Sequence, residues 1–76
     1  MEYNKIDISA ELERIEKDLK DMEESGTKQT ILGFFAGAEN ERAFLIAARA
    51  FVKARGYAAV HEYEDGELVL IIRKVA

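Results

Sequence analysis

Apolar positions recur along this chain in two different periods, and each period predicts one kind of element. Residues 9–25 show the helical period and end at Gly26, with Ser9 as the expected N-cap. The apolar positions of this first helix form a narrow seam, because they are only three and four residues apart: Leu12, Ile15, Leu19 and Met22. Residues 3–8 alternate weakly and indicate at most one short additional strand.

A second helix is predicted over residues 38–55, closing on Gly56, and it holds the largest concentration of apolar residues. At 100° per residue its surface divides into three parts. A broad core face is expected to hold Phe44, Ala47, Phe51 and Ala54, widened by Ile46 and Ala50. A separate apolar ridge consists of Leu45, Ala48 and Val52, and a polar strip consists of Arg42, Arg49 and Lys53. Since a surface helix normally buries one stripe, the ridge requires cover from the first helix or from a second copy of the chain.

Three strands are predicted around this helix, over residues 27–36, 57–64 and 67–75. Asp65-Gly66 is typical of a type I′ turn and joins the last two strands as a hairpin, in which Glu64 lies opposite Glu67. The last strand is apolar on both faces, so we expect it in the centre of the sheet. The first strand is also apolar on both faces, which favours an inner or doubly covered position, and its Gly33 indicates a bulge or the close approach of another group.

Together these elements predict one α+β domain spanning residues 1–76, in the order (β)αβαββ. A right-handed crossover through the second helix leaves a gap into which the last strand fits, giving a split β-α-β arrangement with a C-terminal hairpin. Both helices are then expected on one face of a three- or four-stranded sheet. The opposite face stays open and partly apolar, and its expected interface residues are Val60, Val69, Ile71 and Val75.

Composition adds an acidic balance that is concentrated in the first helix. The 76 residues carry 15 Asp and Glu against 11 Lys and Arg, a net charge of −4. Residues 11–24 account for this whole excess, and the acidic surface expected there comprises Glu13, Glu16, Glu23 and Glu24. Such a balance argues against non-specific nucleic-acid binding. The absence of cysteine, of a signal-peptide pattern and of an apolar run long enough to span a membrane favours a cytoplasmic protein without a membrane partner.

No motif in the sequence indicates catalytic or metal-binding chemistry. Neither Ser9 nor Ser25 has the tight-turn context of a nucleophile, so we expect no enzyme activity and no cofactor. His61 is the single histidine, and on a strand it points away from Glu62 and Glu64, so the three cannot converge on one metal ion. The candidate phosphate contacts are the residues of the polar strip, Arg42, Arg49 and Lys53. No aromatic residues alternate with them, which favours a solvated face.

From Gly26 onward the order of elements resembles that of a known family. A strand is followed by a helix that closes on Gly56-Tyr57 and then by the run from Glu64 to Leu70, EDGELVL. This order is similar to the α+β domain of the ribonuclease E regulator B family. The resemblance implies an acidic, non-catalytic protein that inhibits an enzyme by binding it, and it carries over no site residues. In size, acidity and lack of catalytic motifs the chain is also similar in type to small phage anti-CRISPR inhibitors.

These observations predict a small, non-enzymatic protein-binding module that acts as an inhibitor or adaptor of a macromolecular partner. The resemblances direct this expectation toward a nucleic-acid-processing complex. Self-association as a symmetric homodimer is expected through the open sheet face, or through the ridge that contains Leu45 and Val52. Two alternatives stay open. One is a nucleic-acid-binding module that uses the basic strip, and the other is a structural or designed α+β domain without activity, since the chain lacks proline and cysteine.

Overall fold

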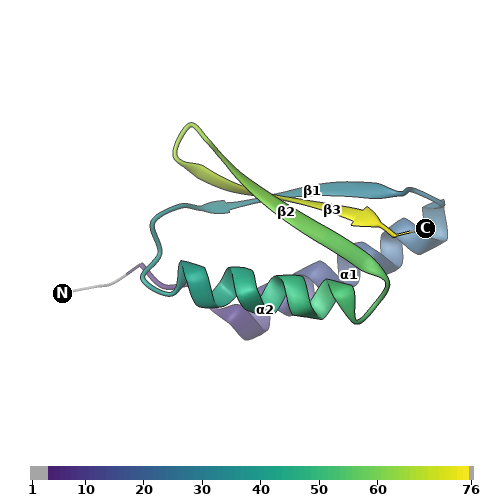
Figure 1. Ribbon diagram of the computed structural model, residues 1–76, viewed down its shortest axis with the longest axis horizontal. Coiled ribbons are helices and arrows are strands. Elements are labelled where there is room, and N and C mark those ends of the chain that lie inside the picture. The colour runs from purple at the N-terminus through teal and green to yellow at the C-terminus, as the bar shows by residue number, and fades with distance from the viewer. Residues whose placement is uncertain (1–3, 76) are drawn as a thin grey trace.

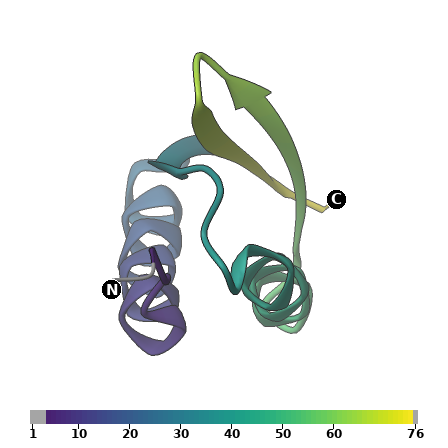
Figure 2. The same cartoon turned by 90° about the vertical axis from the view of Figure 1, so that its left-hand side faces the viewer.

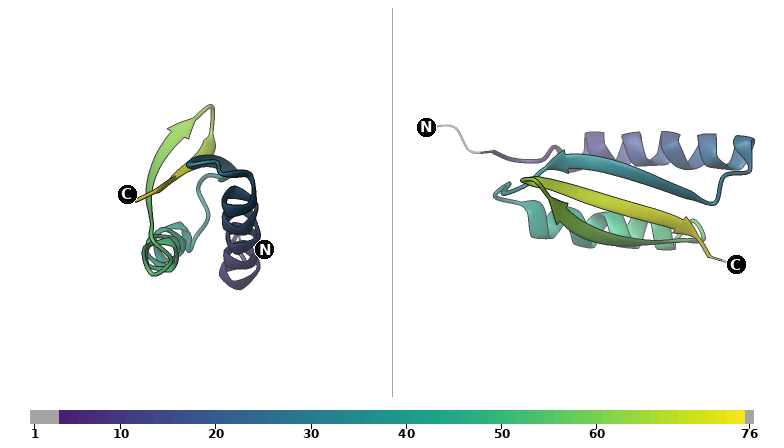
Figure 3. Two further views of the ribbon diagram at one scale, coloured as in Figure 1. Left: turned by 90° about the vertical axis from the view of Figure 1, so that its right-hand side faces the viewer. Right: turned by 90° about the horizontal axis from the view of Figure 1, so that it is seen from above.

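The chain folds as two helices on one side of a small sheet. The computed structural model describes residues 4–75, in the order α1 (Ile8–Ser25), β1 (Gln29–Phe35), α2 (Glu41–Lys53), β2 (Tyr57–Glu64) and β3 (Glu67–Lys74). The strands form one antiparallel sheet in the order β1-β3-β2 (Figure 1). Both helices lie beneath this sheet (Figure 2), α1 on the β1 side and α2 on the β2 side (Figure 3). The α+β class, the split β-α-β arrangement and the central last strand are therefore confirmed, with three strands in the described part of the chain.

The hairpin between β2 and β3 has the predicted turn and register. Asp65 and Gly66 have φ values of 50° and 77°, the two positive values that a type I′ turn requires. Glu64 pairs with Glu67, and the register continues without interruption to Tyr57 and Lys74. Side chains of β3 therefore alternate strictly between the helix side and the open side of the sheet.

Gly33 marks a close approach and not a bulge. The pairing of β1 with β3 runs without a break from Gln29 to Phe35, and Gly33 lies opposite Val69. A Cβ atom on Gly33 would lie 2.9 Å from Glu67 Oε2, so the glycine makes room for that carboxylate. The expectation of an inner or doubly covered β1 is wrong, because β3 occupies the centre and β1 is an edge strand.

The core lies between the sheet and the two helices. From β3 it receives the fully buried Leu68, Leu70 and Ile72, and from α1 it receives Ile15, Leu19 and Met22. On α2 the ridge predicted as separate is the middle of the buried face, since Phe44, Leu45, Ala48 and Val52 are all buried. The predicted widening by Ile46 and Ala50 is wrong: both are exposed, as is Ala54. Phe44 packs against Phe34 of β1, and Leu45 lines a hollow together with His61 and Tyr63 of β2, so the side of α2 that carries the exposed Ile46 faces solvent.

The first helix begins earlier than the sequence pattern suggested, with its N-cap two residues before the expected one. Its N-cap is Asp7 and not Ser9, and Asp7 Oδ1 accepts a hydrogen bond of 3.2 Å from the amide of Ala10. Residues 4–7 form no strand. Instead Asn40 exchanges two side-chain hydrogen bonds of 2.8 Å with the backbone amide and carbonyl of Ile6. Tyr3, the first residue of the proposed strand, lies outside the described residues.

Helix α2 is shorter than the predicted span of 38–55. It begins after Asn40 and ends at Lys53, and the chain then turns into β2 through Gly56, which has a φ of 86°. Across residues 4–75, neither helix combines the length and the apolar character needed to cross a membrane.

Candidate functional site

The side of the sheet away from the helices is the main candidate surface, and we call it the open face. The register of the three strands assigns it the following residues: Gln29, Ile31, Gly33 and Phe35 from β1, Glu67, Val69, Ile71 and Arg73 from β3, and Ala58, Val60, Glu62 and Glu64 from β2. Ile31, Ile71 and Val60 form one row across all three strands. Ile31 and Val60 are 58% and 55% exposed, and Phe35 is 49% exposed. Apolar side chains therefore occupy the centre of a surface that neither α1 nor α2 covers.

Charged residues lie at the two ends of the open face and have opposite signs. The hairpin end carries three carboxylates, from Glu62, Glu64 and Glu67. At the other end Arg73 lies beside Gln29, to whose Oε1 its Nε donates a hydrogen bond of 2.6 Å. The open face thus has a negative end, an apolar middle and a positive end, an arrangement that can orient a bound partner as well as hold it.

The interface residues expected from the sequence divide between three places. Val60, Val69 and Ile71 lie on the open face, as expected. Val75 is 55% exposed but lines a different hollow, together with Arg49 and Lys53 of α2. The remaining two, Leu45 and Val52, are 7% and 0% exposed and belong to the core, so they are not available to a partner.

Two residues of the open face were missing from that expectation. Ile31 and Phe35 belong to β1, and their alternation already placed them on one side of that strand. Only the pairing of β1 with β3 shows that this side is continuous with Val60 and Ile71. The sequence contains a strong signal for the hairpin register, in Asp65-Gly66, but no comparable signal for the register between strands that are distant in the chain.

The acidic surface of α1 is partly neutralised by the chain itself. Glu16 forms an ion pair of 3.6 Å with Arg55, and Glu23 forms one of 3.6 Å with Lys74. Glu13 and Glu24 are exposed. Half of the predicted acidic surface therefore serves to connect α1 to the end of α2 and to β3, at the modest energies typical of exposed pairs.

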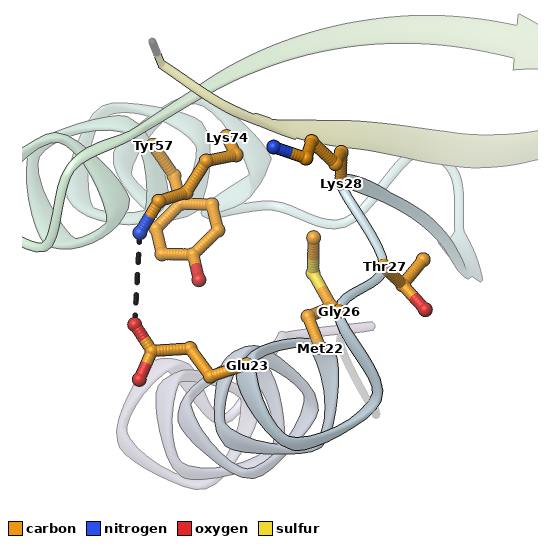
Figure 4. Close-up of a pocket in the computed structure, with 7 residues that line it drawn as sticks. All are labelled: Met22, Glu23, Gly26, Thr27, Lys28, Tyr57 and Lys74. Carbon is orange, nitrogen blue, oxygen red and sulfur yellow. Dashed lines mark ion pairs between the residues drawn. The ribbon is translucent and has the colours of Figure 1, made fainter.

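The pair between Glu23 and Lys74 borders a hollow of about 290 Å³ at the C-terminal end of α1. Figure 4 shows the Lys74 side chain running past the ring of Tyr57, with its ammonium directed toward Glu23. The Nζ atom lies 4.9 Å from the centre of that ring, a cation–π distance. Because Lys74 already has these two partners, the hollow is better explained as a junction between α1 and the sheet than as a ligand site.

The predicted basic strip is divided between two hollows on the outer side of α2. Arg42 and Arg49 line one of about 460 Å³, whose other wall contains His61 and Tyr63 of β2. Lys53 lines the other hollow, which it shares with Arg49. The guanidinium of Arg49 lies 2.7 Å from His61 Nδ1, so Arg49 is the neighbour that supplies the hydrogen bond to the single histidine. The structure therefore brings two aromatic rings to a strip that has no alternating aromatic residues in the sequence.

Tyr63 connects β2 to the start of α2 across this hollow. Its hydroxyl donates a hydrogen bond to Glu41 Oε2, while Glu41 Oε1 accepts one of 2.8 Å from the amide of Gly37. The hydrogen bond from Tyr63, and secondly that from Gly37, hold the pKa of Glu41 below its ordinary value. The same hydrogen bond to Glu41 raises the pKa of Tyr63. Glu41 is therefore ionised at neutral pH and acts as a fixed acceptor.

Among residues 4–75 no three His, Asp or Glu side chains come together in a way that could hold a metal ion. His61 lies on the helix side of β2, whereas Glu62 and Glu64 belong to the open face.

Comparison with known proteins adds no family: no protein-family model, no curated protein and no solved structure matches this chain. The resemblance to the ribonuclease E regulator B family therefore stays a prediction.

Proposed function

We propose that this protein is a non-enzymatic protein-binding module that acts as an inhibitor or adaptor by occupying a macromolecular partner with its open face. One observation carries the proposal: the row of Ile31, Ile71 and Val60 crosses the centre of a sheet face that neither α1 nor α2 covers. Apolar surface of this kind, flanked by polar residues, is typical of a protein interaction site.

The open face is also suited to binding because it is preorganised. All three of its strands are paired along their full length, and the opposite side of the central strand is anchored by the buried Leu68, Leu70 and Ile72. Little conformational entropy is therefore lost when a partner docks. The carboxylates of Glu62, Glu64 and Glu67 favour a partner whose apolar patch has a basic border.

Capture experiments with matched variants test this proposal. Ile71→Lys places a charge in the centre of the open face, whereas Ile46→Lys places the same charge at a 63% exposed isoleucine on α2. Wild type and Ile46→Lys are expected to retain the same binding proteins from lysate, identified by mass spectrometry, and Ile71→Lys is expected to lose them. Equal capture by all three proteins, each shown to be folded by its thermal transition, would refute a role for the open face.

A separate double variant tests whether the acidic surface of α1 contributes to binding. Reversing Glu16 or Glu23 would break ion pairs within the chain, so the informative change is Glu13→Lys with Glu24→Lys. If the acidic surface steers a basic partner, this double variant slows association and weakens its salt dependence while leaving dissociation nearly unchanged. Following the resemblances above, the captured proteins are expected to include an enzyme that processes nucleic acids.

A second candidate function is phosphate or nucleic-acid binding at the hollow between α2 and β2. The observation that favours it is the convergence of Arg42 and Arg49 with the rings of His61 and Tyr63. Affinity for a single-stranded probe, measured by fluorescence anisotropy, would then fall with salt by about 0.7 log units per log unit for each phosphate neutralised. Arg42→Ala should lower that slope and Lys17→Ala on α1 should not. No binding at low salt removes this candidate.

A further inference from the structure

The charges of the open face are arranged so that the face complements itself. Its negative end carries Glu62, Glu64 and Glu67, and its positive end carries Arg73. Between them lie the apolar side chains of Val69 and of the row through Ile71. A surface with an apolar centre and oppositely charged ends can pair with a second copy of itself if the copy is turned end to end.

Symmetry restricts how two such faces can meet. For two identical faces to be buried against each other, the two-fold axis must lie in the plane between them. An axis parallel to the strands places the negative end of one copy on the negative end of the other, and repulsion between the carboxylates destabilises that arrangement. An axis across the strands places the negative end of each copy on the positive end of the other. The charges therefore select the second arrangement.

We propose that the open face is an interface between two copies of this chain, stacked with β3 of one copy antiparallel to β3 of the other. This proposal rests on the proposed function, in that it names the protein that occupies the open face. In aligned packing of this type the sheets lie about 10 Å apart and their strands cross at about 30°.

The distribution of side chains also indicates the register. The apolar area is centred between the Ile71 row and the Val69 row, and an axis placed there sets Ile71 opposite the partner's Val69. Arg73 then lies opposite the partner's Glu67. Ile31 lies over the partner's Gly33, where the sheet carries no side chain of its own. In the single chain the carboxylate of Glu67 covers Gly33. In the dimer this carboxylate is drawn toward the partner's Arg73, and the partner's Ile31 covers Gly33 instead.

The area of the open face sets the expected affinity of the dimer. Three strands about 4.8 Å apart and seven residues of about 3.3 Å each cover roughly 14 by 23 Å, or roughly 330 Å² of sheet per copy. This flat area is well below the roughly 800 Å² per partner of a standard interface, so we expect a weak, reversible dimer that forms only in the micromolar range. A foreign partner with a larger surface could displace the second copy, which would couple self-association to the proposed function.

Charge-reversal variants test the orientation directly. Arg73→Glu sets two carboxylates against each other at both ends of the dimer, and Glu67→Arg sets two guanidinium groups against each other. Each variant alone is expected to raise the dimer Kd in sedimentation equilibrium by about tenfold or more. An equimolar mixture of the two is expected to recover the wild-type Kd, since each copy then meets opposite charge at both ends.

The control variant Ile46→Lys should dimerise like wild type, and Val60→Glu, at a 55% exposed position that this register sets opposite the partner's Glu62, should be monomeric. Wild type that stays monomeric at high micromolar concentration overturns the proposal. The proposal is also overturned if Arg73→Glu or Glu67→Arg alone dimerises like wild type, or if their mixture does not recover the wild-type Kd. If the monomeric protein still captures a partner that Ile71→Lys loses, the occupant is foreign, and the proposed function stands without the dimer. If neither self-association nor capture depends on Ile71, both proposals fail.

Discussion

Two glycines in this protein serve different purposes, and alanine substitutions should separate them. Gly66 has a φ of 77°, and a Cβ added there would meet nothing within 4 Å, so Gly66→Ala is costly only through its backbone conformation. We expect it to lower the free energy of unfolding by about 1 to 2 kcal/mol. Gly33 lies in a strand, and a Cβ there meets only the flexible end of Glu67. Gly33→Ala should be neutral, or stabilising by up to about 1 kcal/mol.

Urea unfolding of the two variants measures this difference. The double variant Gly33→Ala, Glu67→Ala serves as a control, because it removes the carboxylate that a Cβ on Gly33 would displace. If Gly33→Ala is as destabilising as Gly66→Ala even in that background, the explanation of Gly33 by a close approach is incorrect.

The hydrogen bonds to Glu41 predict a pH-dependent contribution to stability. Because the pKa of Glu41 is lower in the folded than in the unfolded protein, its contribution is present above the unfolded pKa and is lost as pH falls through the folded pKa. Glu41→Gln should therefore be less stable than wild type near pH 7, by less than about 1 kcal/mol for a site this exposed. The difference between their urea midpoints should shrink as pH falls below the ordinary pKa range of a glutamate. A difference that is unchanged by pH would mean that the carboxylate charge is not involved. In a Tyr63→Phe background, most of the pH-dependent effect of Glu41→Gln should be lost.

At the scale of elements, the start of α1 offers a comparison between two polar residues. Asp7 caps the helix through its bond to the amide of Ala10, whereas Ser9 already lies within the first turn. Asp7→Ala should lower the free energy of unfolding by about 1 kcal/mol, and Ser9→Ala should change it by a few tenths at most. Thermal unfolding followed by circular dichroism measures both. The reverse order would show that the helix begins at Ser9 in solution.

At the scale of the whole molecule, the packing of α2 beneath the sheet and beside α1 decides which side of α2 is buried. Leu45 is 7% exposed and its neighbour Ile46 is 63% exposed, although both are large and apolar. Leu45→Ala should therefore lower the free energy of unfolding by about 2 to 5 kcal/mol, and Ile46→Ala by about 0.5 kcal/mol or less. Chemical denaturation distinguishes them easily. Similar losses at both positions would mean that a second surface, such as another copy of the chain, covers Ile46.

Local chemistry in the sequence was enough to predict the elements and the hairpin. Asp65-Gly66 determines a type I′ turn through backbone sterics alone, and that turn sets the register of every pair from Glu64 to Tyr57. The continuous apolar run of β3 likewise indicated a central position, which the strand order confirms. Val60, Val69 and Ile71 could be assigned to the open face because their placement follows from this register and the period of two along a strand.

Only the tertiary structure decided the features that depend on contacts between segments far apart in the chain. Whether Leu45 or Ile46 is buried depends on how α2 packs against the sheet and α1, because the apolar residues of α2 extend almost around the helix. The inclusion of Ile31 in the open face depends on the pairing of β1 with β3, and no local turn specifies that register. The meeting of Arg49 with His61 depends on the approach of α2 to β2. The sequence determined what short-range sterics and periodicity enforce, whereas these surfaces exist only because the packed chain brings together residues that are far apart in it.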